Sequence, residues 1–243
     1  MVTWKKNRNL EKRLIELYHR GLGFGVIAEM LSEEFGMDFS VKSIDSRIFV
    51  LKEEGKLGSW LDESKVAFLD IETTDFSADI GIMLSWAIKF PGADEVISDV
   101  ITKKELFNGT FDRRICQSLV DEIKKIDVIV TYFGTGFDNV FLRTRCLILG
   151  IDFPVYGSIK HYDVYYTARS KLKLHSKRLD SVAKALGCSS QKTPVDISEW
   201  QKARWGNKES LGYVLEHNRL DVFVLEEVYN KLRPFVKVMR KSI

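Results

Sequence analysis

The sequence predicts an α/β fold in which a mixed sheet is flanked by helices and preceded by a small three-helix domain. Apolar residues recur at helical spacing before residue 55, and short apolar runs typical of buried strands follow residue 65. Short connections join the first three of these runs, and strands then alternate with helices. This order indicates a mixed sheet and not a helical bundle or a β-sandwich.

Three apolar stripes at helical spacing lie in the N-terminal part of the chain. They cover residues 10–18, 26–31 and 44–51. Glycines follow the first two stripes, as is common at helix ends, and Ser40 is placed to cap the third helix. The stripes therefore predict three short helices.

A polar segment with two glycines, EGKLGSWLDES, interrupts this pattern. We therefore expect a helical domain over residues 1–58 and an α/β domain over residues 59–243. The helical domain is similar to a helix-turn-helix module, with VKSIDSRIFVLKEEG as its recognition helix, from which Lys42 and Arg47 would contact DNA. Because acids and bases nearly balance there, docking of another protein is the alternative interpretation.

The α/β domain contains apolar runs and amphipathic stretches in alternation. Strands are expected at residues 66–72, 82–90, 96–101, 128–132 and 159–163. Helices are expected over residues 112–126, from residue 137, and over residues 179–186 and 211–232.

Composition limits the classes of protein to which the chain can belong. Its 45% apolar and 29% charged residues are ordinary for a globular protein, and its net charge of +3 demands no polyanionic partner. Three scattered cysteines without CxxC pairing argue against disulfides and zinc. The basic start has no apolar run behind it, and no window approaches the roughly 18 apolar residues of a membrane span. We therefore expect a soluble, cytoplasmic protein without a membrane partner.

Acidic residues lie where buried apolar residues would be expected. Asp70 and Glu72 end an apolar run and, being two apart in a strand, leave the same face. Asp221 falls on the apolar stripe of the last helix together with Val214 and Leu225. A buried carboxylate costs several kcal/mol unless it is protonated, paired or bound to a metal.

Asp138 begins a helix after a glycine-containing turn, where the helix dipole alone can explain an acid. Together with Asp70, Glu72 and Asp221, however, it completes a set of four carboxylates that would repel one another without a counter-charge. Oxygen ligands suit hard cations, and two ions about 4 Å apart are usual in phosphodiester chemistry. We therefore expect these four residues to bind two divalent cations, Mg²⁺ or Mn²⁺.

Three motifs resemble those of the DEDD family of 3′–5′ exonucleases, relatives of polymerase proofreading domains within the ribonuclease-H superfamily. In chain order they are FLDIETT with Asp70 and Glu72, VTYFGTGFDNVFL with Asp138, and HNRLDV with Asp221. The segment HYDVYYTARSKLKLHSKRLDSVAKALG resembles the connector in the predicted-nuclease branch of that family. The likeness covers residues 65–236 and implies a ribonuclease-H-like sheet.

The resemblance also implies contacts with the terminal nucleotide. Thr73 and Thr74 match positions that meet it, and Phe76 is expected either to be a base-stacking wedge or to be a core aromatic. The second motif commonly has Asn where this chain has Phe133, and the third usually has Tyr four residues or His five residues before its aspartate. Here His217 is four residues before it, so it is expected either to accept the proton of the attacking water or to orient Asp221.

A basic cluster without an intervening acid follows the second motif. It consists of Arg169, Lys171, Lys173, Lys177 and Arg178. Such a cluster is either a solvated face or, beside a phosphodiesterase site, a surface that steers phosphates. Asp163, just before the cluster, is expected to cap the next helix rather than to bind metal.

Taken together, the motifs predict a metal-dependent 3′–5′ exonuclease that acts on DNA or RNA with a free 3′ end, with DNA favoured. Two alternatives stay open from the residues alone. One is a catalytically inactive module that binds nucleic acid, and the other is an endonuclease or ribonuclease on the same core.

Overall fold

The computed structural model describes residue 4 and residues 8–19, 22–54, 65–189 and 196–235. It divides the chain into two compact units, the N-terminal unit (Met1–Ser64) and the C-terminal unit (Lys65–Ile243). The expected domain boundary between residues 58 and 59 lies outside the described residues and stays a prediction.

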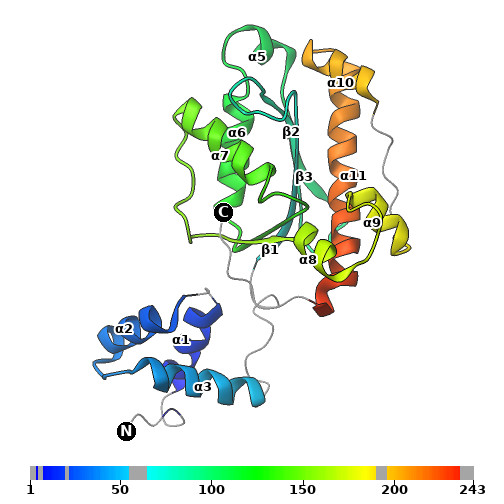
Figure 1. Ribbon diagram of the computed structural model, residues 1–243. Helices are drawn as coiled ribbons and strands as arrows, with labels where there is room; N and C mark the ends of the chain where they lie inside the picture. Colours follow the sequence, from blue (N-terminus) through cyan, green and yellow to red (C-terminus); the bar gives the residue numbers. More distant parts are fainter. Residues whose placement is uncertain (1–3, 5–7, 20–21, 55–64, 190–195, 236–243) are drawn as a thin grey trace. The chain divides into compact units, whose positions relative to one another are not determined.

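The N-terminal unit contains the three predicted helices, α1 (Arg8–His19), α2 (Phe24–Phe35) and α3 (Val41–Glu53) (Figure 1). Their apolar stripes pack together into a core of this unit alone, which includes Leu14, Ile27 and Ile44. Ser40 caps α3 as predicted, because its Oγ accepts a hydrogen bond from the Ser43 N–H at 3.2 Å. The helix-turn-helix assignment stays a prediction.

Arg47 requires a correction, because its expected contact with nucleic acid needs an accessible side chain. Only 6% of Arg47 is exposed. Its guanidinium pairs with Glu11 of α1 and lies 3.8 Å from the Glu54 carboxylate. It shares the inner face of α3 with Ile44 and Ile48, so its physical role is to join α3 to α1. Lys42 is exposed at the start of α3.

The C-terminal unit is built on a five-stranded mixed sheet, and all five strands lie where the sequence predicts them. They are β1 (Val66–Thr73), β2 (Met83–Lys89), β3 (Val96–Val100), β4 (Val128–Thr131) and β5 (Lys160–Asp163), in the order β3-β2-β1-β4-β5. The first three strands are antiparallel, whereas β4 and β5 run parallel to β1. The predicted α/β class is confirmed.

The central strand β1 has different partners on its two faces. Ala67, Leu69 and Ile71 belong to the main core of the unit. Phe68 points the other way and packs edge-on against Tyr229, with 5.4 Å between the ring centroids. Because side chains alternate along a strand, Asp70 and Glu72 share the face of Phe68.

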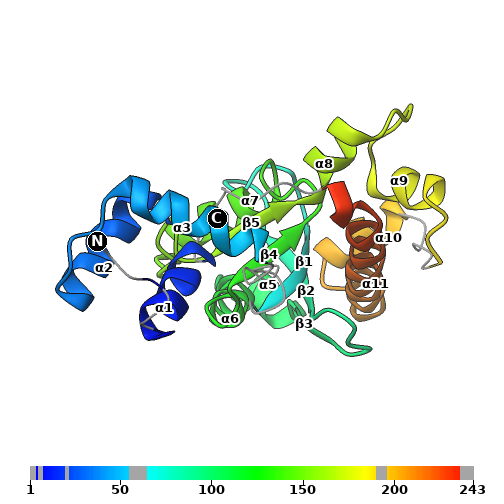
Figure 2. The same cartoon turned by 90° about the horizontal axis from the view of Figure 1, so that it is seen from below.

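Helices cover both faces of this sheet. Figures 1 and 2 show α6 (Arg113–Ile123) and α7 (Asp138–Leu149) on one side and α11 (Lys208–Leu232) on the other. Together with α9 (Leu179–Ala185), these are the helices that the sequence predicts, with ends shifted by a few residues.

For three short helices of this unit no range was predicted, and each buries at most two residues. They are α5 (Lys103–Phe107), α8 (Val164–Lys171) and α10 (Ile197–Arg204), and a 3₁₀ turn, η2 (Arg233–Phe235), follows α11. No residue of α5 is buried, and α10 buries only Ala203. A sequence signal for α5 does exist, because Thr102 and Glu105 form a capping box.

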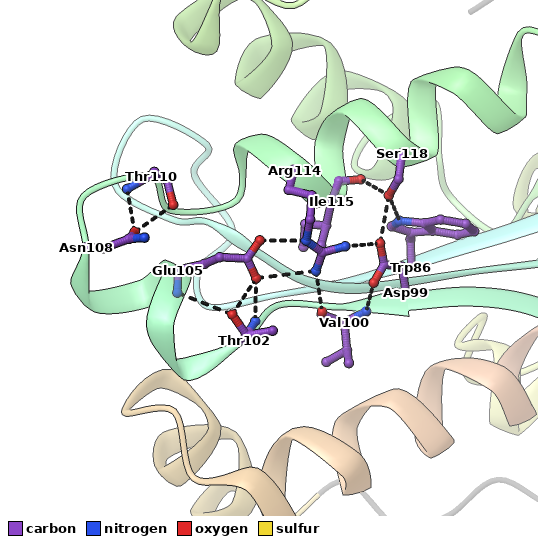
Figure 3. A network of polar contacts seen from close by, with 10 residues as sticks. All are labelled: Trp86, Asp99, Val100, Thr102, Glu105, Asn108, Thr110, Arg114, Ile115 and Ser118. Atoms are coloured by element: carbon purple, nitrogen blue, oxygen red, sulfur yellow. Dashed lines mark hydrogen bonds and ion pairs between the residues drawn. The ribbon is translucent and has the colours of Figure 1, made fainter.

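Arg114 fastens α5 and α6 to the edge strand β3 (Figure 3). Its guanidinium donates to the Glu105 carboxylate at 2.6 Å and to the Val100 carbonyl at 2.8 Å, and it also pairs with Asp99. Ser118 extends the network, because its Oγ accepts a hydrogen bond from the Trp86 indole at 3.1 Å. The network fixes α5 beside the end of the sheet that carries the acidic residues.

Candidate functional site

The end of β1 delivers two carboxylates to the face that α11 covers. Asp70 pairs with Ala87 and Glu72 with Ser85 of β2, so both lie in regular sheet. The pairing becomes irregular between Glu72 and Thr73, where the strand ends. The sequence prediction that these acids share one face is therefore confirmed.

Helix α11 places His217 and Asp221 against these acids. Both are buried, as the apolar stripe predicts for Asp221. The His217 Nε2 lies 3.8 Å from Glu72 Oε1 and 3.8 Å from Asp221 Oδ2. Ligand atoms of Glu72, His217 and Asp221 all lie within 4.8 Å of one another, so this group could hold a metal ion. The sequence predicts His217 one helical turn from Asp221, and the structure places its imidazole between the carboxylates of Glu72 and Asp221.

The His217 imidazole is also fixed by its neighbour on α10. The ring of Trp200 packs perpendicular to it, with 5.1 Å between the ring centroids. The contact restricts rotation of the imidazole.

Asn218 is a site residue that the sequence reasoning missed. It is fully buried, and its Nδ2 donates a hydrogen bond to Asp70 Oδ2 at 2.6 Å. Its Oδ1 accepts one from Ser85 Oγ at 3.2 Å. The helical spacing did contain the signal, because Asn218 lies three residues before Asp221 and thus on the same face.

Asp138 reaches the site from the opposite side of β1. Its Oδ1 accepts a hydrogen bond from the Ile71 N–H at 3.2 Å. Burial raises the pKa of Asp138 from 3.8 to about 7, opposed by backbone hydrogen bonds and assisted by repulsion from Asp163 and Asp221. Asp138 is outside the group within 4.8 Å, but its hydrogen bond with the N–H of Ile71 places it beside the stretch of β1 that carries Asp70 and Glu72.

This burial gives an expected result for Asp138→Asn. The pKa of Asp138 is higher in the folded chain than in the unfolded chain, so the ionised carboxylate destabilises the fold. The free energy of unfolding should therefore fall as pH rises from about 4 through 7. In EDTA at pH 8 we expect the variant to melt on the order of 5 °C above the wild type, with a smaller gap at pH 5. The amide oxygen can still accept the Ile71 hydrogen bond. Asp79→Asn, at an exposed acid, is the matched control; a gap that is equal at both pH values would contradict the argument.

Asp163 caps α8, as the sequence predicts, because its carboxylate accepts a hydrogen bond from the Tyr165 N–H at 3.1 Å. The same carboxylate accepts hydrogen bonds from the N–H groups of Phe133 at 2.8 Å and Thr135 at 2.9 Å. Asp163 therefore holds the loop that leads from β4 to Asp138.

The residues after β1 form a hydrogen-bonded loop. The Thr73 hydroxyl donates to the Asp75 carbonyl at 2.8 Å, and the Thr74 hydroxyl accepts from the Ile82 N–H at 3.0 Å. Phe76 is 89% exposed, with its ring centroid 6.0 Å from that of Phe137. The expectation of a core aromatic at this position is therefore wrong.

A groove of about 550 Å³ opens beside Thr74. Its walls include Phe107 of α5, Phe111 and Trp205, all of which are exposed. The basic cluster lies elsewhere in the chain, on and after α8. There Arg169, Lys171, Lys173 and Arg178 are exposed, whereas Lys177 is half-buried and donates to the Leu174 carbonyl at 2.9 Å.

No helix in the described part of the chain is both long and apolar enough to cross a membrane. The cysteines Cys116, Cys146 and Cys188 are free.

Comparison with known proteins gives three findings. A family model described as RNase_H superfamily matches residues 67–233. A DNA polymerase of Thermococcus kodakarensis is 26% identical over 214 residues, which covers 75% of this chain but only 12% of the polymerase. The structure of the family B DNA polymerase from the archaeon Pyrobaculum calidifontis matches with a TM-score of 0.55 and 22% identity, over 71% of this chain and 25% of that one. The match to the solved structure shows the fold.

Proposed function

The chain belongs to the RNase H superfamily, and we propose that it is a metal-dependent 3′–5′ exonuclease that hydrolyses phosphodiester bonds. The observation that carries the proposal is the convergence of acids from β1, α7 and α11 on one place. Two carboxylates and an imidazole lie within 4.8 Å of one another there, with Asp70 and Asp138 beside them.

The donor set fits divalent cations. Carboxylates suit Mg²⁺ or Mn²⁺. We assign Asp70, Glu72 and Asp221 to one ion, and Asp70 with Asp138 to the second. When bound, the ions would supply Lewis-acid stabilisation of the developing phosphoryl charge and favour ionisation of the attacking water.

His217 is the residue that would accept the proton of that water. It lies between Glu72 and Asp221, whose carboxylates would stabilise the imidazolium that forms. Asn218 would keep Asp70 oriented through its hydrogen bond. Thr73, Thr74 and Phe76 would hold the terminal nucleotide, with the exposed Phe76 ring stacking on its base.

The substrate class rests on the relatives. Both polymerases to which the chain is similar are named for DNA, which favours DNA over RNA as the substrate. The 3′ to 5′ direction rests on the resemblance of the three motifs to the DEDD family. The chain spans 12% of the length of the first polymerase and 25% of the second.

The decisive experiment uses single-stranded DNA and RNA oligonucleotides labelled at the 5′ or the 3′ end, with Mn²⁺ or Mg²⁺ and with EDTA. A 3′–5′ exonuclease turns the 5′ label into a ladder and releases the 3′ label as a mononucleotide. Internal cuts would indicate an endonuclease, and cleavage of RNA alone a ribonuclease. Binding without cleavage would favour the inactive module.

The N-terminal unit gives a second expected result. A variant that begins at Ser59 should still cut short oligonucleotides, because the four carboxylates assigned to the cations lie beyond that residue. It should bind long nucleic acid several-fold more weakly. Turnover on 8-mers and affinity for 40-mers test this, with Lys42→Gln as the finer variant because Lys42 is exposed on α3. If the shortened protein melts cooperatively but cuts nothing, the N-terminal unit is needed for cleavage, and the proposal that it only adds affinity for long nucleic acid is wrong.

A further inference from the structure

Phe133 is held at the surface in an unusual backbone conformation. Its φ of 69° lies in the left-handed region, which bulky residues rarely adopt. Two N–H groups of this loop, those of Phe133 and Thr135, bind the buried Asp163 carboxylate and stabilise the turn. The ring lies over Gly136, where a Cβ would be 2.5 Å from it. The loop thus holds Phe133, a residue that is 42% exposed, in a strained backbone conformation.

The Phe133 ring belongs to a group of three aromatic side chains, which we call the aromatic cluster: Phe133, Tyr165 and Tyr166. Phe133 packs edge-on against Tyr165 with 4.8 Å between the ring centroids, and Tyr165 packs against Tyr166 at 5.3 Å. Tyr132 supports Tyr165 from a third side at 5.9 Å and anchors its own hydroxyl on the Lys177 carbonyl at 2.6 Å. Tyr166 is 37% exposed, so the cluster offers rings to solvent at both ends.

Cations continue from the aromatic cluster along the chain. Arg169 lies four residues after Tyr165 on α8 and therefore on the same face, one turn away. Lys171 and Lys173 follow, and all three are exposed. Within the described ranges, no acidic side chain forms an ion pair with any of them. Proteins that bind single strands combine aromatic rings, on which bases stack, with positive charge that follows the phosphates.

The aromatic cluster is also continuous with the acidic site. The Phe137 N–H donates to the Phe133 carbonyl at 3.0 Å, so Phe133 lies one turn from Asp138. Asp163, which holds Phe133, also accepts a hydrogen bond from the Thr135 N–H of the same loop at 2.9 Å. The aromatic cluster therefore begins in the loop that leads directly into Asp138.

We propose that the aromatic cluster and the cations of α8 form a binding site for single-stranded nucleic acid, with unpaired bases on the rings and phosphates on Arg169 and Lys171. The proposal rests on the proposed nuclease function and extends it by naming the substrate as a single strand. Paired bases in a duplex are stacked on one another, so their faces are not available to side chains. The site does not require a particular base, because every base has a π-face.

The test compares a fluorescent oligothymidine with an abasic strand of equal length and charge, and with a duplex, by anisotropy on the full chain in EDTA. Removal of the bases removes stacking and keeps the phosphates. Stacking on protein aromatics changes affinity by about 5- to 150-fold per base. We expect the wild type to prefer oligothymidine over the abasic strand by at least about fivefold, and to bind the duplex more weakly than oligothymidine.

Two variants and one control localise the preference. Phe133→Leu and Tyr166→Leu should each reduce it at least threefold without weakening the abasic strand. Tyr156→Leu removes a ring that is 78% exposed in the loop before β5, away from the strand ends that carry the acids, and should behave as the wild type. Arg169→Gln should weaken both strands equally and lower the dependence of affinity on salt.

The results separate this proposal from the nuclease function. Equal affinity of the wild type for both strands, no binding of either, or an unchanged preference in both leucine variants overturns the aromatic cluster as a base-binding site. If metal-dependent cleavage persists in that case, the nuclease function stands alone. A base preference that the leucine variants reduce, in a protein that cuts nothing, supports the binding site and rejects the nuclease.

Discussion

Asp70→Asn should abolish cleavage while leaving the fold intact. Asp70 is assigned to both cations, so its loss removes a ligand from each, and we expect turnover to fall by at least about 10³-fold. The fold should persist, because an asparagine oxygen can still accept the hydrogen bond that Asn218 donates to Asp70. Turnover on a labelled oligonucleotide at saturating Mn²⁺ measures the first effect, and thermal melting in EDTA measures the second.

Melting with and without Mn²⁺ also tests the binding site itself. A ligand that binds the native state alone raises its stability by an amount that depends on its affinity. Metal should therefore raise the melting temperature of the wild type more than that of Asp70→Asn. Asp79→Asn makes the same charge change at an exposed position of the loop after β1 and should respond as the wild type. Equal metal-induced shifts in the wild type and Asp70→Asn would argue against the carboxylate site.

His217→Ala should lower turnover by about 10²- to 10⁴-fold if the imidazole accepts the proton of the attacking water. Its position 3.8 Å from both Glu72 and Asp221 lets it take a proton and share the resulting charge with two carboxylates. A proton acceptor must be neutral before the reaction. Wild-type activity should therefore rise with pH as the imidazole loses its proton, and the variant should lose this dependence.

The controls for His217 separate catalysis from metal binding. Metal affinity is measured for each variant at each pH, because carboxylate ligands also bind protons. His217→Tyr tests whether a tyrosine, which the resemblance places at this position, restores activity. His175→Ala removes an exposed histidine of the basic segment and should leave the pH profile unchanged. A His217→Ala protein within threefold of the wild type, with the same profile, would leave His217 as a residue that only orients Asp221.

The sequence alone was sufficient for the order of the strands along the chain and for the faces on which the acids lie. Alternation in β1 puts Asp70 and Glu72 on one side, and the 3.6-residue period of α11 puts His217 and Asp221 on its buried stripe. These are local periodicities, which do not depend on what packs against the element. The ranges of the short helices α5, α8 and α10 were not predicted because these helices bury few residues or none, and so lack such a period.

The tertiary structure decided what each polar side chain contacts, because such contacts join elements far apart in the chain. Asn218 meets Asp70 across 148 residues, and His217 comes between Glu72 and Asp221 only when α11 packs on β1. The sequence predicts that Arg47 is an exposed cation that contacts DNA, yet the packing of α3 on α1 buries it beside Glu11. Phe133 is presented to solvent only because Asp163, from another strand, holds its backbone. Local pattern determines the face of an element, whereas the partner across that face is a property of the assembled fold.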